Sequence, residues 1–67
     1  MGRLFVKDDT EQWKYNINWS WVANRDDWFY AVNDERRRYN EKIMTQEQAY
    51  AKFEEYYPKE DFENGKT

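Results

Sequence analysis

Apolar and polar residues alternate without interruption between Gln12 and Val22. Because successive side chains of a strand point to opposite faces, a period of two predicts a β-strand. Residues 4–7 are a candidate edge strand before it, with residues 8–10 as the connecting turn. The apolar side of the long strand would carry Trp13, Tyr15, Ile17, Trp19 and Trp21, and its polar side Lys14, Asn16, Asn18 and Ser20.

Two further strands are predicted beyond this one. Residues 28–32 read Trp-Phe-Tyr-Ala-Val, and aromatic and β-branched residues favour a pleated surface. Residues 33–35 are polar turn formers, after which residues 37–44 alternate again. Together the segments predict a three-stranded antiparallel meander, or a four-stranded one if residues 4–7 join it.

Thr45 marks the predicted start of a helix. Its hydroxyl can accept a hydrogen bond from the amide of Gln48 while the Gln48 side chain reaches back to the amide of Thr45, which is a reciprocal capping box. Apolar residues then recur at helical spacing until a proline stops the pattern. The apolar residues are Ala49, Phe53 and either Tyr56 or Tyr57, and the proline is Pro58.

The fold class predicted from these elements is α+β, with the antiparallel meander packed by one C-terminal helix. Residues 1–58 would form a single domain, which is as much as 67 residues allow. Residues 59–67 are polar and contain Asn64-Gly65, so they are predicted to be a flexible tail unless Phe62 docks on the domain.

One competing interpretation replaces the second and third strands with a helix that Asp27 would cap. Its shared apolar face would hold Trp28, Val32, Tyr39 and Ile43. The strands are preferred because the aromatic and β-branched residues at the start of this stretch lose side-chain freedom in a helix.

The composition suggests how so short a chain can hold a core, and it removes most catalytic chemistry. Trp, Tyr and Phe make up 21% of the residues, and each ring can bury on the order of 150 to 250 Å². The chain has no Cys and no His, so disulfides, thiolate ligands, the usual zinc ligand and the usual general base are all missing. Paired carboxylates such as Asp26-Asp27 fall mostly in predicted turns, where Asp bonds its own backbone. We therefore predict no catalytic residue, no metal, no cofactor and no enzymatic activity.

The formal net charge is -3, and the acidity lies towards the C-terminus: residues 1–44 hold 8 basic and 8 acidic residues, and residues 45–67 hold 3 and 6. This balance disfavours attraction to duplex phosphates. Arg36, Arg37 and Arg38 could clamp a phosphate or carboxylate, because guanidinium groups pair bidentately with both, or form a solvated turn neutralised by Asp34 and Glu35. No apolar stretch approaches the roughly 20 residues of a membrane span, which favours a cytoplasmic protein.

The long first strand would carry more rings than one helix can cover. A helix is about 10 Å wide and strands lie about 4.8 Å apart, so one helix shields about two strands and leaves the ends of a long strand bare. Exposed Trp and Tyr side chains often mark partner surfaces, although the same rings could simply form the core, as expected for Tyr15 and Ile17 at the strand centre. The predicted partner-binding residues are Trp13, Trp19, Trp21, Trp28, Arg36, Arg37, Arg38, Glu54 and Glu55.

Residues 28–53 read as a strand, a charged turn, a return strand and a helix that begins at Thr45 and continues through Ala49 and Phe53. This order resembles the small three-stranded-sheet-plus-helix modules at the N-termini of tyrosine-type phage integrases. The resemblance implies a sheet that contacts DNA with a basic surface, whereas this chain is acidic. In size, acidity, aromatic content and lack of cysteine, the whole chain is similar to small phage-encoded proteins that bind and inhibit a host enzyme or defence complex.

Three functions agree with these patterns. The leading hypothesis is a non-enzymatic protein-binding module, an inhibitor or adaptor, that uses sheet aromatics and an acidic helix to engage a basic or nucleic-acid-processing protein. The alternative is a single-stranded nucleic-acid binder in which rings stack on bases and the arginines at residues 36–38 hold the backbone. The third is a homo-oligomer that pairs its aromatic surface with a second copy.

Overall fold

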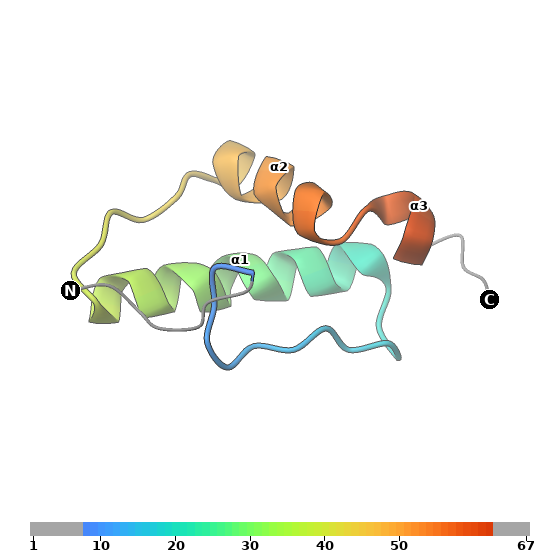
Figure 1. Ribbon diagram of the computed structural model, residues 1–67, viewed down its shortest axis with the longest axis horizontal. Coiled ribbons are helices and arrows are strands. Elements are labelled where there is room, and N and C mark those ends of the chain that lie inside the picture. Colours follow the sequence, from blue (N-terminus) through green and yellow to red (C-terminus); the bar gives the residue numbers. More distant parts are fainter. Residues whose placement is uncertain (1–7, 63–67) are drawn as a thin grey trace.

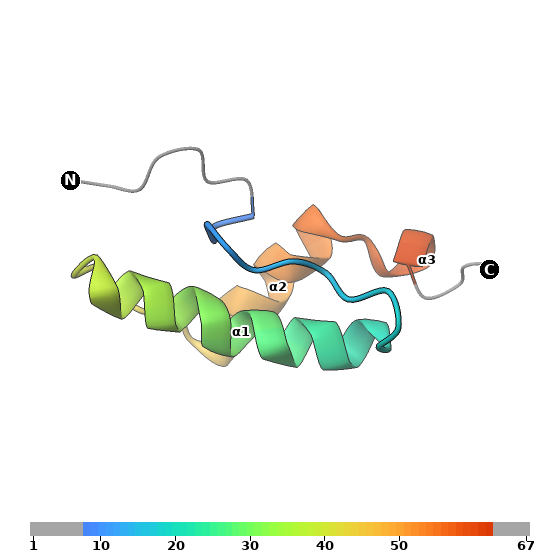
Figure 2. The ribbon, with the colours of Figure 1, turned by 90° about the horizontal axis from the view of Figure 1, so that it is seen from below.

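The computed structural model describes residues 8–62, which contain three helices (Figure 1). α1 spans Trp21–Arg38, α2 spans Gln46–Tyr56 and α3 spans Lys59–Phe62. α1 and α2 lie side by side and run in opposite directions (Figures 1 and 2). Residues 8–20, the N-terminal segment, have no regular secondary structure and run alongside α1. The core lies between these three parts.

The predicted α+β fold with a sheet meander is wrong, because residues 8–62 contain no β-strand. Most of the stretch assigned to the second and third strands belongs to α1, so the competing interpretation predicted the correct type of secondary structure there. Its bounds were not correct, since the helix begins at Trp21 and not after Asp27, and it ends at Arg38, before Ile43. The sheet that the likeness to integrase modules implied is likewise absent from residues 8–62, and the candidate edge strand at residues 4–7 lies outside them.

Polar residues on the buried face of α1 explain why its periodicity was missed. The buried positions of α1 recur at helical spacing, as a helix packed on one side requires. Half of them are polar, however, and a count of apolar positions alone assigns such residues to the solvent side. The buried residues of α1 are Trp21, Asn24, Trp28, Val32, Asn33 and Glu35.

Both ends of α1 carry defined caps. The Ser20 hydroxyl accepts a hydrogen bond of 3.0 Å from the amide of Ala23 at the N-terminus. At the C-terminus Asn40 has a φ of 60°, the left-handed conformation that Asn tolerates better than most residues. This allows the amides of Asn40 and Glu41 to donate to the carbonyls of Arg37 and Arg36, a Schellman motif that turns the chain towards α2.

Side chains of α1 form hydrogen bonds with the backbone of the N-terminal segment, as a neighbouring strand would do in a sheet. Asn24 accepts a 2.7 Å hydrogen bond from the amide of Asn16 and donates a 2.9 Å bond to its carbonyl. The carboxylate of Glu35 accepts bonds of 2.9 and 3.0 Å from the amide of Glu11. Because buried backbone groups need partners, these contacts let a segment with strand-like alternation pack on a helix without a sheet.

The segment that joins α1 to α2 is held in the same way. Asn33, which is buried on α1, accepts a 2.8 Å hydrogen bond from the amide of Met44 and donates a 2.9 Å bond to its carbonyl. Residues 41–45 therefore lie against α1 as an irregular chain, where a return strand was predicted.

The predicted C-terminal helix is confirmed as α2, including its capping box. The Thr45 hydroxyl accepts a 3.2 Å bond from the amide of Gln48, and the Gln48 side chain accepts a 3.1 Å bond from the amide of Thr45. α2 turns Ala49 and Phe53 into the core, as the spacing predicted. Pro58 follows immediately after the C-cap of the helix.

Phe53 lies at the centre of an aromatic core. Its ring is fully buried, and five other rings have centroids 5.0 to 6.3 Å from it. These rings come from the N-terminal segment, from α1 and from the end of α2, so one side chain joins all three parts of the molecule. They are Trp13, Tyr15, Trp21, Trp28 and Tyr57.

α3 occupies residues that were predicted to belong to a polar tail. The ring of Phe62 packs against this end of the core, with its centroid 4.8 Å from that of Tyr15 and 5.3 Å from that of Tyr57. Phe62 nevertheless remains exposed on its outer side. Within residues 8–62, no helix is long and apolar enough to cross a membrane.

Candidate protein-binding turn

The four tryptophans predicted to bind a partner lie in three different environments. Trp21 and Trp28 are buried core residues, so their rings are not available at the surface of this fold. Trp13 is half-buried, and its indole N–H donates a 2.8 Å bond to Asp27. Trp19 is 48% exposed. Of the four, only Trp19 is an exposed residue in this fold.

The three arginines form the last turn of α1 and do not converge on one ligand. Successive residues of a helix point about 100° apart. Arg36 pairs with Asp9 at 2.9 Å, whereas Arg38 pairs with Asp34 at 2.8 Å on the exposed surface. The hydrogen bond to Asp34 raises the pKa of Arg38. Arg37 is exposed. The positive charges of all three arginines stabilise the C-terminal end of α1, where the helix macrodipole is negative.

Glu54 and Glu55 lie exposed on α2, as an acidic helix face requires. Neither forms an ion pair with a basic residue in the part of the chain that the structure describes. Further exposed carboxylates lie along the same two C-terminal helices, at Glu47, Glu60 and Asp61. α2 and α3 together hold five acidic and two basic residues, so this part of the surface is negative.

Residues 16–19 form a tight turn that leads into α1. The amide of Trp19 donates a 3.0 Å bond to the carbonyl of Asn16, which closes a β-turn. The amide of Asn18 donates a 2.9 Å bond to the Asn16 side chain, an Asx turn inside the first. Asn24 anchors the backbone of Asn16 from α1, and Ser20 caps the helix directly after the turn. The turn is therefore fixed at both of its ends.

This turn directs apolar side chains into solvent. Ile17, at its first central position, is 85% exposed, and Trp19 closes the turn with about half of its surface in water. Val22, in the first turn of α1, is also exposed. Turn tips usually carry polar residues, so a rigid turn that presents Ile and Trp is unusual on energetic grounds. We call Ile17, Trp19 and Val22 the apolar turn surface.

Sequence reasoning named Trp19 as a partner-binding residue, but it placed Ile17 in the core at the centre of a strand and so missed the turn. Two local signals could have located it. Asn16 and Asn18 are typical of Asx turns, and a serine follows them where a helix can begin. The helix start was hidden because Trp21 also continued the alternating pattern.

A polar cluster joins α1 to α2 beside the core. The guanidinium of Arg25 lies 3.7 Å from the centroid of the Tyr50 ring and pairs with Asp26 at 3.1 Å. The Tyr50 hydroxyl donates a 2.7 Å bond to Asp26. This bond lowers the pKa of Asp26, and Arg25 lowers it further. Every member of the cluster has a partner within it, which indicates a structural role.

No protein-family model matches this sequence, and comparisons with curated proteins and with solved structures found no match either. Among residues 8–62 there is also no group of three or more acidic side chains placed to hold a metal ion. The candidate site is therefore identified only by the geometry of the residues described above.

Proposed function

We propose that this protein is a non-enzymatic protein-binding module, a small inhibitor or adaptor, that engages its partner through the apolar turn surface. The observation that carries the proposal is the exposure of Ile17 and Trp19 on a turn whose backbone is already fixed. Trp is the residue type most enriched at interface hot spots. A turn that is ordered before binding loses little conformational entropy when it docks.

The acidic surface of α2 and α3 would complement the apolar contact. Five carboxylates and two lysines lie on these helices, and none of the carboxylates forms an ion pair among the described residues, in a chain of net charge -3. Charge of this kind steers association towards a basic surface and excludes acidic competitors. A basic protein, such as one that handles nucleic acid, is the partner class that fits.

The decisive variant is Trp19→Ala, because truncating a hot-spot ring typically costs about 2 kcal/mol or more, a loss of roughly thirtyfold in affinity. Partners captured from lysate would be identified by mass spectrometry, and the affinity of the main one measured by calorimetry. Ile17→Ala should weaken the same complex. Raising the salt concentration should slow association, whereas the loss caused by Trp19→Ala should persist.

Tyr30→Ala is the matched control, since Tyr30 is 74% exposed on α1 but lies outside the apolar turn surface. It should bind with unchanged affinity. Circular dichroism should show that all variants remain folded. If folded Trp19→Ala captured the same proteins with the same affinity, the proposal would be wrong.

The single-stranded nucleic-acid alternative has less support. Trp21 and Trp28 are buried and cannot stack on bases, and Arg36 and Arg38 already pair with carboxylates. Saturable quenching of Trp fluorescence by an oligonucleotide at low salt would favour it over protein binding. Self-association through the apolar turn surface would appear instead as a mass that rises with concentration. The likeness to phage-encoded inhibitors and the cytoplasmic location stay predictions.

A further inference from the structure

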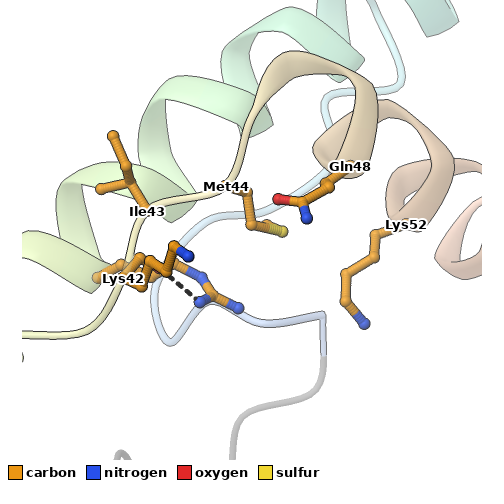
Figure 3. Close-up of a pocket in the computed structure, with 6 residues that line it drawn as sticks. Lys42, Ile43, Met44, Gln48 and Lys52 are labelled. Atoms are coloured by element: carbon orange, nitrogen blue, oxygen red, sulfur yellow. Dashed lines mark hydrogen bonds between the residues drawn. The ribbon is translucent and has the colours of Figure 1, made fainter.

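A cavity of about 430 Å³ lies at the C-terminal end of α1 (Figure 3), whereas the apolar turn surface lies at the N-terminal end of this helix. Its walls come from three elements: the last turn of α1, the segment that joins the helices, and α2. This volume is within the range of small-ligand sites, which starts at about 300 Å³. The residues that line it are Arg36, Lys42, Ile43, Met44, Gln48 and Lys52.

The polar lining of the cavity consists of hydrogen-bond donors. Lys42 and Lys52 approach it from different elements and have no ion pair among the described residues. The side-chain oxygen of Gln48 is occupied by the amide of Thr45, which leaves its amide nitrogen for the cavity (Figure 3). No acidic side chain is among the described residues of the lining.

Arg36 lines one side of this cavity, and hydrogen bonds hold its guanidinium in place. Its guanidinium donates to Asp9 at 3.0 Å and to the carbonyl of Lys42 at 2.8 Å, so its position and most of its donors are committed. Asp9 offsets its charge. The uncompensated charge of the cavity is therefore that of Lys42 and Lys52, which is two positive charges in a protein that is acidic overall.

The cavity also has an apolar side. Met44 is buried at its base, whereas the side chain of Ile43 points away from Gln48 and Lys52 (Figure 3). A ligand that fills the space would cover this surface and gain hydrophobic free energy in proportion to the apolar area removed from water. A bare inorganic anion would leave it uncovered.

We propose that this cavity binds a phosphate monoester that carries an apolar group. A monoester has a second pKa near 6 and is largely dianionic at neutral pH, which matches the two uncompensated lysines. Lysine ammonium groups bind phosphate as point charges, and the Gln48 amide adds a neutral donor. The apolar group would lie on Met44.

The test is a titration of the ¹⁵N-labelled full chain with phenyl phosphate, followed by NMR. Shifts that saturate should cluster at residues 42–44 and 48–52. Lys42→Gln and Lys52→Gln should each weaken binding about tenfold, because each removes one close opposite charge. Lys14→Gln is the matched control, since Lys14 is exposed and lies outside the cavity; it should leave the affinity unchanged.

Phenol and inorganic phosphate each represent one part of phenyl phosphate. Titrated separately, both should bind more weakly than phenyl phosphate. The proposal fails if phenyl phosphate gives no saturable shifts, or if the shifts map away from the cavity. It also fails if Lys42→Gln and Lys52→Gln bind as tightly as Lys14→Gln. Because all three variants leave the apolar turn surface intact, this outcome is independent of protein binding through Trp19.

Discussion

Asp8 shows how a single residue that looks like a turn former can be part of the core. It is 3% exposed, and its carboxylate accepts hydrogen bonds of 2.6 Å from Thr10 and 2.5 Å from the Tyr57 hydroxyl. Its carbonyl accepts a 2.8 Å bond from the indole of Trp28. Buried charge is tolerated only when it is hydrogen-bonded, and here the bonds join the N-terminal segment to α1 and to the end of α2.

Tyr57 should make the protein sensitive to alkaline pH. Burial raises the pKa of Tyr57, and the hydrogen bond to Asp8 raises it further. A pKa above the unfolded value of about 10 means that this stabilisation is complete below pH 10 and is lost as the pH rises from there towards the folded pKa. The free energy of unfolding in urea should therefore be lower at pH values above about 10 than at pH 8.

Tyr57→Phe should flatten this alkaline decrease because it removes the titrating hydroxyl. At neutral pH it should cost about 1 to 3 kcal/mol, since Asp8 loses a hydrogen bond to a buried carboxylate. Tyr30→Phe, at an exposed position, is the control and should change neither value. An unaltered alkaline slope in Tyr57→Phe would contradict the assignment.

At the scale of elements, α1 replaces a sheet. Asn24 and Asn33 each bond both the amide and the carbonyl of one residue in a neighbouring irregular segment, Asn16 and Met44 respectively. A side-chain amide has one acceptor and two donors in a plane, which is the same chemistry that a neighbouring strand offers. Two buried asparagines therefore fix the segments on both sides of the helix.

Asn24→Asp and Asn33→Asp test this role with almost no change in shape. Each exchanges the donating amide nitrogen for an oxygen that faces a backbone carbonyl. We expect each to lower the free energy of unfolding by about 1 to 3 kcal/mol, measured by urea titration, because a buried polar group loses its partner. Asn18→Asp is the control, since Asn18 is exposed. Losses as small as that of Asn18→Asp would show that the paired bonds add little.

At the scale of the whole molecule, stability depends on one aromatic cluster. A chain of 67 residues hides only about 60% of its extended surface on folding, so its core is thin. Phe53 contacts rings from the N-terminal segment, from α1 and from the C-terminal end of α2. Loss of this ring would leave a cavity at the point where all three parts meet.

Phe53→Ala should therefore cost about 3 to 5 kcal/mol, a large share of the 5 to 15 kcal/mol that typical domains have. We expect a much lower melting temperature and loss of the near-ultraviolet circular dichroism of the packed rings. Phe62→Ala is the control, because Phe62 packs at the edge of the cluster and is partly exposed. If Phe53→Ala melted no earlier than Phe62→Ala, Phe53 would not be the centre of the core.

The sequence by itself determined the parts of this protein whose contacts are local. α2 could be predicted because its capping box and its Ala49 and Phe53 spacing lie within a few residues of one another. The exposed acidic residues Glu54 and Glu55 were also correctly located on α2. The aromatic content indicated the nature of the core, although it did not distinguish buried Trp21 and Trp28 from exposed Trp19.

Only the tertiary structure decided whether an alternating segment would pair with a strand or lie on a helix. Alternation shows that a chain has two different sides, but it does not show what satisfies its backbone groups. Here the partners are Asn24, Asn33 and Glu35, which come from distant positions and whose polarity concealed the buried face of α1. The exposed turn at Ile17 follows from the same contacts, because Asn24 stops the segment at Asn16 and turns the next residues outward.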